Sequence, residues 1–548
     1  MASDAIRTEL ARVAAMLGAP AGFVVELETP RDKTHGDVST NVAMLLAKPL
    51  RQAPRQIAEQ IVSFAKFPPG LVSAVEIAGP GFINFRLGAG QLTNILTTII
   101  AAGQYYGRAL ARSPQRINVE FVSANPTGPL HVAHGRGAAL GDCVATLLEW
   151  QGHLVQREFY VNDAGAQIVR LGESLWARVQ QEAGREAAIP ENGYHGAYLV
   201  ELAKRLIQER GPWFAEHPAA VGIEQCRAFA VEALAAEQAQ TLAAFRVKFD
   251  LFFDESQLYR ERHVEQTLAA LTARGVLYEE GGALWLRTTT WGDDKDRVLR
   301  KSDGTYTYFL PDIAYHEHKA SRGFDRAVDV WGADHHGYVP RMRAAMQALG
   351  HRADFFEALI VQLVTVLKGG EEVKMSKRAG DFISLRELVD EVGVDAARYF
   401  FLMRRSDTPF AFDIDLATRK SDENPVFYVQ MAHVRMASLF RVGAIDPATV
   451  TADGVDITVL TDPSEPELLK ILARFPEAAA RAAESLEPQR VTAYCEELAR
   501  AAHHWYHKCR VLGEPPAVER ARLALARAAQ ITIANALALL GMSAPERM

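Results

Sequence analysis

The chain has few of the features that mark secreted, disulfide-bonded or membrane proteins. Its four cysteines, Cys143, Cys226, Cys495 and Cys509, are far apart and form no Cys-x-x-Cys pair. A disulfide framework and a cysteine zinc site are therefore not expected, and a reducing cytosol fits. No apolar run is long enough to span a bilayer, and the N-terminal residues lack the basic-then-apolar form of a secretory signal. We expect a cytoplasmic protein without a membrane partner.

An excess of positive charge is also missing. The chain has 60 Lys and Arg residues against 67 Asp and Glu, which gives a formal net charge of -7 at pH 7. A nucleic-acid partner usually calls for a basic surface, so the bulk charge argues mildly against one. It does not exclude one, because a large enzyme can keep a basic path locally. With 548 residues the chain is too long for one core, and two to four domains are expected.

The sequence pattern changes twice along the chain. Residues 1–110 read as a separate α/β module, which ends in a Gly-Pro-Gly turn and an alternating strand at 82–87. From about 115, a strand, a loop, a helix to about 151 and a second strand form one βαβ unit, as in a doubly wound parallel sheet. This second region is expected to span 111–405 and to carry a helical, alanine-rich insertion at about 170–280. Residues 406–548 read as helical almost throughout.

One histidine pair lies where a loop after a strand enters a helix. His131 and His134 are three residues apart, so both fall on one side of the first helical turn, followed by Gly135. Free N–H groups and the positive end of the helix dipole attract phosphate there, and imidazoles can donate hydrogen bonds to a triphosphate. On the same helix Ala133, Gly137 and Gly141 form a bare stripe that a ligand or another backbone could approach. The alternative is that the histidines cap the helix and the glycines allow tight packing.

A second motif lies far downstream, at residues 374–380. Lys374, Met375, Ser376 and Lys377 follow a Gly-Gly turn, and a capping box starting at Ser384 predicts a helix after them. A mobile loop that carries two lysines can close on a pyrophosphate leaving group and neutralise it. The alternative is a solvated basic loop.

The two motifs together resemble the paired signatures of class I aminoacyl-tRNA synthetases. The second signature is intact, whereas the first has Ala133 where the family has a glycine that lets adenine lie against the backbone. Nearly the whole chain further resembles arginyl-tRNA synthetases of bacterial type. The stretches that carry this resemblance include 120–126, 160–165, 293–298, 302–304, 308–316, 332–338, the N-terminal 79–85 and the C-terminal 539–548.

The resemblance implies an α/β fold with three parts: an N-terminal module that binds tRNA, a Rossmann-type parallel-sheet catalytic domain and an α-helical anticodon-binding domain. It implies ATP-dependent activation of L-arginine to arginyl-adenylate and transfer to tRNA(Arg), with activation dependent on bound tRNA. Mg²⁺ is expected with ATP rather than at a dedicated protein site, and a monomer is expected.

The resemblance also assigns roles to individual residues. His131, His134, Lys374 and Lys377 are the expected catalytic residues. Gly135, Gly332, Asp334, Met375 and Ser376 are expected to bind ATP, with Asp334 at the ribose hydroxyls. A guanidinium is best held by carboxylates, and the expected arginine-binding residues are Glu120, Ser123, Asn125, Tyr308, Asp312 and His335. Taken alone, Asp312 is equally well explained as a helix cap, Glu120 as an ordinary strand residue and Asp334 as a turn residue.

The expected tRNA contacts lie in the two terminal regions. They are Phe82 and Asn84 in the N-terminal module, and Tyr428, Gln430, Trp505, Tyr506 and Arg510 in the helical region. Unpaired bases stack on aromatic rings, and arginine neutralises phosphates. The alternative for each aromatic residue is packing between helices.

Three other functions compete with this interpretation. A synthetase for a different amino acid would not need the acidic pocket residues or the N-terminal module. A catalytically silent tRNA-binding paralogue is suggested only by Ala133, and the intact lysine motif argues against it. A free-standing nucleotidyltransferase would have no use for the helical region.

Overall fold

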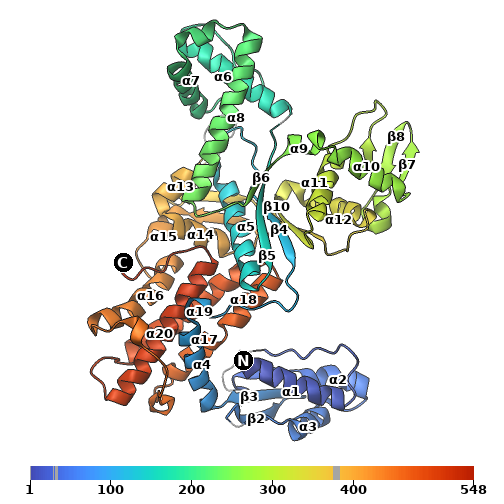
Figure 1. Cartoon of the computed structure of the whole chain (residues 1–548). Coiled ribbons are helices and arrows are strands. Elements are labelled where there is room, and N and C mark those ends of the chain that lie inside the picture. Colours follow the sequence, from blue (N-terminus) through green and yellow to red (C-terminus); the bar gives the residue numbers. More distant parts are fainter. Residues whose placement is uncertain (1, 29, 31–34, 69, 164, 374–382) are drawn as a thin grey trace.

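The computed structural model describes residues 2–28, 30, 35–68, 70–163, 165–373 and 383–548. Figure 1 shows a central sheet with helical extensions above it, to its right and below it. Within the described ranges, no helix is long and apolar enough to cross a membrane.

The central sheet is parallel and has the strand order β11-β10-β4-β5-β6. Its strands are β4 (Arg116–Glu120), β5 (Leu154–Val161), β6 (Leu251–Asp254), β10 (Arg326–Gly332) and β11 (Phe356–Val361). Helix α5 (Val132–Trp150) connects β4 to β5, so the predicted βαβ unit and doubly wound sheet are confirmed. The strand order runs one way from β4 to β6 and the other way from β10 to β11. The switch point is therefore the boundary of β4 and β10, where ligands bind at the carboxyl edge of such sheets.

Two extensions follow the carboxyl ends of the sheet strands. The first consists of α6 (Ala166–Glu182), α7 (Ala197–Arg210) and α8 (Ala219–Ala244), which enclose their own apolar core at the top of Figure 1. The expected insertion at about 170–280 was too long, because Leu251–Asp254 returns to the sheet as edge strand β6. An apolar run as short as that of β6 does not distinguish a strand from a helix.

The second extension lies to the right in Figure 1. It contains the helices α9 (Glu255–Arg260), α10 (His263–Ala273), α11 (Phe309–Ser321) and α12 (Val339–Ala348), and the antiparallel sheet of β7 (Leu277–Glu280), β8 (Ala283–Leu286) and β9 (Arg297–Arg300). Helix α11 packs against the central sheet, and a single apolar core runs from this extension to β10 and β11. That packing brings the N-terminal turn of α11 to the carboxyl edge of the sheet.

Residues 414–548 are helical, and the prediction that the chain is helical almost throughout beyond 405 misses only the short strand β14 (Phe410–Asp413). After the small sheet of β12 (Val364–Lys368), β13 (Glu371–Glu372) and β14, the main helices are α13 (Leu385–Val392), α14 (Val394–Leu402), α16 (Pro425–Val442), α17 (Ser464–Ala473), α18 (Phe475–Glu484), α19 (Gln489–Lys508) and α20 (Pro516–Leu539). The capping box predicted at Ser384 is confirmed, since its hydroxyl accepts from the N–H of Glu387 and its own N–H donates to the Glu387 carboxylate. Gly541 follows α20 with a φ of 69°, as a C-terminal glycine should.

The N-terminal module lies beneath the central sheet in Figure 1. It contains α1 (Ala2–Met16), α2 (Val42–Leu50), α3 (Pro54–Phe64) and the antiparallel strands β1 (Val38–Thr40), β2 (Val72–Ala78) and β3 (Phe82–Leu87). Helix α4 (Ala89–Ala102), which the expected boundary at 110 placed with this module, packs instead on α17 and α20.

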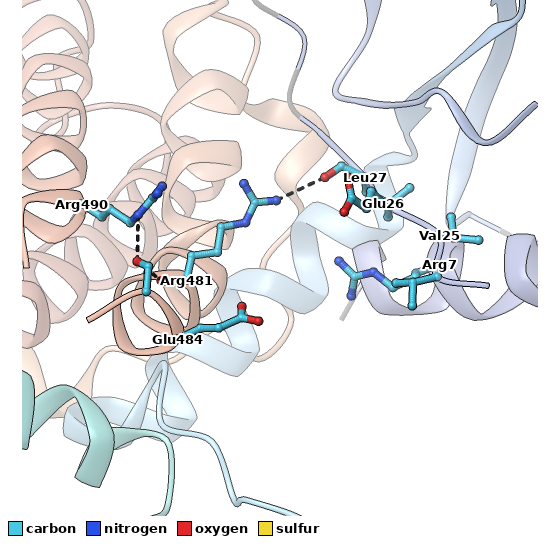
Figure 2. A pocket seen from close by; sticks show the side chains of 9 residues that line it. Arg7, Val25, Glu26, Leu27, Arg481, Glu484 and Arg490 are labelled. Atoms are coloured by element: carbon cyan, nitrogen blue, oxygen red, sulfur yellow. Dashed lines mark hydrogen bonds between the residues drawn. The ribbon is translucent and has the colours of Figure 1, made fainter. Parts of the chain in front are cut away.

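A cleft separates the N-terminal module from α18 and α19. Figure 2 shows its charged lining, with Arg7 and Glu26 facing Arg481 and Glu484. Across it, Arg481 donates to the carbonyl oxygen of Leu27 at 3.2 Å. Acids and bases are mixed in this lining, and no catalytic residue expected from the sequence lies in it.

Candidate functional site

The chain leaves β4 in an uncommon backbone conformation. Val122 has a φ of 70° and Ser123 a φ of 40°. A β-branched residue at positive φ is strained, and such strain is typical of functional sites. The Ser123 hydroxyl donates to Glu120 Oε1 at 2.8 Å and accepts from the N–H of Tyr160 at 3.2 Å. The turn therefore ties β4 to the neighbouring strand β5 at the switch point.

Glu120 belongs to a buried cluster of charges beneath this turn. Lys319, on α11, is fully buried, and its ammonium donates to Glu120 at 2.6 Å and to Asp329 at 2.9 Å. The other oxygen of Asp329 lies 2.7 Å from His316 Nε2, and His316 Nδ1 lies 2.8 Å from the carbonyl oxygen of Asp312. Both ring nitrogens of His316 thus face acceptors. The Lys319 ammonium offsets the negative charge of the two carboxylates.

This balance governs the ionisation of the cluster. Burial acts to raise the pKa of Asp329, but Lys319 and His316 outweigh it and hold that pKa at about 2. Burial raises the pKa of Glu120, and Lys319 opposes part of that rise. Glu120, His316 and Asp329 have ligand atoms within 4.8 Å of one another, as a metal site would. The Lys319 ammonium lies among them and already supplies the positive charge.

A second pair of carboxylates has no such cation. Asp312, in the first turn of α11, accepts a hydrogen bond from the Tyr338 hydroxyl, and burial raises its pKa to about 6. Glu255 begins α9 immediately after β6, is hydrogen-bonded to Tyr160, and also has its pKa raised by burial. The charge of Glu255 contributes to the raised pKa of Asp312. Neither carboxylate forms an ion pair with any residue in the described ranges.

Glu255 was not predicted from the sequence as a site residue. The signal that could have found it is the pair of acids Asp254 and Glu255 after the apolar run Leu251–Phe253, at the carboxyl end of a strand. The helical reading of that region hid this signal. Among the predicted arginine-binding residues, Tyr308 precedes α11 and is 92% exposed, and Asn125 donates to the Gln167 side chain at 2.8 Å.

His131 is the N-cap residue of α5 and forms a capping box with His134, which agrees with the capping alternative. The rings of His131 and His134 stack with centroids 3.7 Å apart, and the N–H of His131 donates to His134 Nδ1 at 3.3 Å. Gly135 packs against α13, because a Cβ there would lie 2.5 Å from a Leu385 methyl. Gly141 packs in the same way on Phe121, at 2.2 Å. For both of these glycines the structure therefore favours the packing alternative.

Residues Lys374, Met375, Ser376 and Lys377 of the second signature lie outside the described residues. The segment that follows them is held against the first signature. Ser384 forms a β-bridge with His131, and the N–H of Leu385 donates to the carbonyl oxygen of Leu130 at 2.7 Å. Ser384 and Leu385, which follow the second signature in the sequence, therefore lie against the start of α5.

The end of β10 supplies the remaining polar groups at this edge. Gly332 is its last residue, and a Cβ there would lie 2.6 Å from Asp334 Oδ1, so the side chain of Asp334 folds over the glycine. Asp334 is otherwise exposed, and His335 Nε2 lies 3.5 Å from it. These groups are open to a ligand at the switch point.

The predicted RNA contacts divide into accessible and buried residues. Asn84 is 4% exposed and accepts from Ser39, and Trp505 is fully buried in the main core. Gln430 is 6% exposed and donates to Asp395 and to the carbonyl oxygen of Ser543. The side chains at these three positions are therefore engaged in packing and internal hydrogen bonds, which does not favour the tRNA contacts expected there.

The remaining RNA candidates are accessible. Phe82, Tyr428 and Tyr506 are partly exposed and Arg510 is exposed. Beside the two tyrosines, Arg435 lies over the ring of Tyr506 at 5.7 Å and donates to His503 and His507. Arg435 was not singled out from the sequence, because a lone arginine inside an apolar helix gives no signal.

Comparison with known proteins identifies the class. Residues 94–407 match the family model of the class I tRNA synthetase (R) catalytic domain, residues 2–87 that of the arginyl tRNA synthetase N-terminal domain, and residues 429–548 that of the DALR anticodon-binding domain. The chain is thus a class I aminoacyl-tRNA synthetase, with a Rossmann-like parallel sheet.

Individual relatives narrow this to one amino acid. An arginine–tRNA ligase of Bacillus subtilis is 48% identical over 525 residues, which cover 96% of this chain and 94% of the relative. A Campylobacter jejuni structure described as an arginyl-tRNA synthetase is 34% identical, with a TM-score of 0.77 over 84% of this chain and 99% of the other. Thermus thermophilus arginyl-tRNA synthetase has the same fold, with a TM-score of 0.81, 23% identity and full coverage of both chains. The chain belongs to the arginyl-tRNA synthetase family: it is a ligase that joins arginine to tRNA and uses ATP. The comparisons favour this function over a synthetase for another amino acid and over a free-standing nucleotidyltransferase.

Proposed function

We propose that the guanidinium of arginine binds between Asp312 and Glu255. One observation carries this assignment: both carboxylates are partly buried at the carboxyl edge, and neither has a cation among the described residues. Burying a carboxylate without a partner is costly, and a guanidinium with its fork of donors removes that cost. Tyr308 and Tyr338 flank the site, and the hydrogen bond from Tyr338 leaves the second Asp312 oxygen for the substrate.

Glu120 takes a different role from the one expected. Both of its oxygens are engaged, by Ser123 and by Lys319. We assign Ser123 and Asn125 to the amino and carboxylate end of arginine, with Glu120 fixing the turn that presents them. His335 is accessible at the same edge, and we assign it a contact with the arginine substrate beside Asp334.

The phosphates of ATP are assigned to the two signatures. His131 and His134 donate to the phosphates at the start of α5, and Lys374 and Lys377 neutralise the departing pyrophosphate, with Met375 and Ser376 on the same loop. Gly332 and Asp334 hold the ribose, and Mg²⁺ bound together with ATP would offset the charge of its phosphates. The arginine carboxylate attacks the α-phosphorus and pyrophosphate leaves. A terminal ribose hydroxyl of tRNA then attacks the arginyl carbonyl, and AMP leaves.

The RNA contacts are assigned to the accessible residues Phe82, Tyr428, Tyr506 and Arg510. The anticodon arm would meet α16 and α19, and the N-terminal module would meet another part of the same tRNA. We propose that the enzyme works as a monomer in the cytoplasm. Sedimentation of the purified protein with and without tRNA tests the monomer.

Arginine-dependent pyrophosphate exchange, with and without tRNA, tests the site. Asp312→Asn and Glu255→Gln should each raise the KM for arginine by roughly 30-fold or more, because removing one partner of a buried charge pair costs about 2–5 kcal/mol. The KM for ATP should change little. Glu265→Gln, at an exposed acid on α10, is the matched control. An unchanged arginine KM in both site variants would refute the assignment.

A further inference from the structure

The helical insertion α6–α8 reaches back to the loop between β4 and α5. Gln238, on α8, is 4% exposed, and its amide donates to the carbonyl oxygens of Asn125 at 3.2 Å and Gly128 at 2.8 Å. Tyr198, on α7, donates from its hydroxyl to the carbonyl oxygen of Thr127 at 2.6 Å. Three carbonyls of one short loop therefore have their partners in a separate structural unit.

These bonds determine the shape of the loop. A loop outside regular structure must find partners for its carbonyls, and a buried carbonyl without one is costly. Burial raises the pKa of the Tyr198 phenol, so it stays a donor at all working pH values. Gln167, at the start of α6, accepts from the Asn125 side chain at 2.8 Å, so all three helices of the insertion touch the loop. On its other side, the loop is bonded through Leu130 to the residue after Ser384.

We propose that the insertion is a positioning element for the substrate loop, with Gln238 and Tyr198 as its positioning residues. This rests on the proposed function, in which Asn125 contacts arginine and His131 contacts ATP. The two ends of the insertion join the sheet through β5 and β6, and its apolar core is its own, so it can shift as one body.

The test uses aminoacylation kinetics of the full chain. Tyr198→Phe removes one oxygen and one hydrogen bond, and should lower kcat/KM for arginine by roughly three- to tenfold. Gln238→Met removes two hydrogen bonds and should lower kcat/KM for arginine further. Tyr194→Phe is the matched control, because Tyr194 packs on the same insertion core and its hydroxyl forms no hydrogen bond with a described residue. The control should stay within about twofold of wild type.

A double-mutant cycle separates positioning from general loosening. If Tyr198 acts through Asn125, its substitution should add little in an Asn125→Ala background, whereas independent effects would multiply. Equal melting temperatures of Tyr198→Phe and Tyr194→Phe exclude a stability effect. Kinetics of Tyr198→Phe and Gln238→Met that match the control would overturn the proposal, and Tyr198→Phe alone decides it should Gln238→Met not fold. If Asn125→Ala leaves the kinetics unchanged while Tyr198→Phe impairs them, the role given to Asn125 is overturned instead.

Discussion

Replacing Lys319 with methionine removes the cation at the centre of the buried cluster and keeps most of the side-chain volume. Glu120 then has only the Ser123 hydroxyl, and Asp329 keeps only His316. Removing one partner of a buried ion pair costs about 3–5 kcal/mol when the other charge remains. One carboxyl group can take up a proton instead, so we expect the free energy of unfolding to fall by about 3 kcal/mol at neutral pH.

The loss of stability in Lys319→Met should grow as the pH rises. Burial already raises the pKa of Glu120, and without Lys319 it rises further above its value in the unfolded chain. Between those two values the folded state binds more protons than the unfolded state, so stability falls as pH rises. The melting temperature of Lys319→Met should therefore lie furthest below wild type at pH 8 and approach it near pH 5.

The assay is differential scanning calorimetry at several pH values, with the arginine KM measured in parallel. Lys204→Met, at a half-exposed lysine paired with Glu201, is the control and should change stability by less than about 0.5 kcal/mol. Adding Glu120→Gln to Lys319→Met should recover much of the stability, because the unpaired buried charge is gone. A Lys319→Met protein as stable as wild type at pH 8 would refute the account of the cluster.

Three further predictions follow from the site and its supports. The KM for arginine should rise about tenfold from pH 7 to pH 5, since Asp312, with a pKa of about 6, must be ionised to bind the guanidinium, and Asp312→Asn should flatten this profile. Gly135→Ala should lower stability by about 1–3 kcal/mol, measured by thermal melting, because its methyl would meet Leu385; an unchanged melting temperature would contradict this. Arg435→Ala should raise the KM for tRNA and leave the KM for arginine unchanged, since its guanidinium supports Tyr506 and His507 on the proposed RNA surface; a changed arginine KM would instead indicate a distant structural effect.

The sequence predicted the elements whose signals are local. The β4–α5–β5 unit, the capping box at Ser384 and the placement of His131 and His134 on one side of the first turn of α5 all depend on residues within a few positions of one another, and the structure contains all three. The Rossmann-type sheet followed from them. Together these elements account for the position of the site at the switch point.

The rest depended on tertiary packing. Strand β6 has only four residues beside long alanine-rich helices, so its apolar run looked like part of a helix, and Glu255 was missed with it. Trp505 and Gln430 lie on helices whose covered faces are set by α20 and the C-terminal residues. An aromatic or amide side chain looks the same in sequence whether its helix face is exposed or covered. Ion partners over long separations, such as Lys319 with Glu120, leave no local pattern at all.

The negative net charge illustrates the same limit. The formal value of -7 lowered the expectation of an RNA partner, yet the chain joins arginine to tRNA. The sum averages regions with different roles: Asp312 and Glu255 place negative charge where a cationic amino acid is proposed to bind, and Arg435 and Arg510 place positive charge on α16 and beside α19. Because salt screens charges over roughly 8 Å at physiological ionic strength, each region acts on its own ligand almost independently. For an enzyme with one cationic and two polyanionic substrates, the placement of charge therefore carries the functional information, and its total does not.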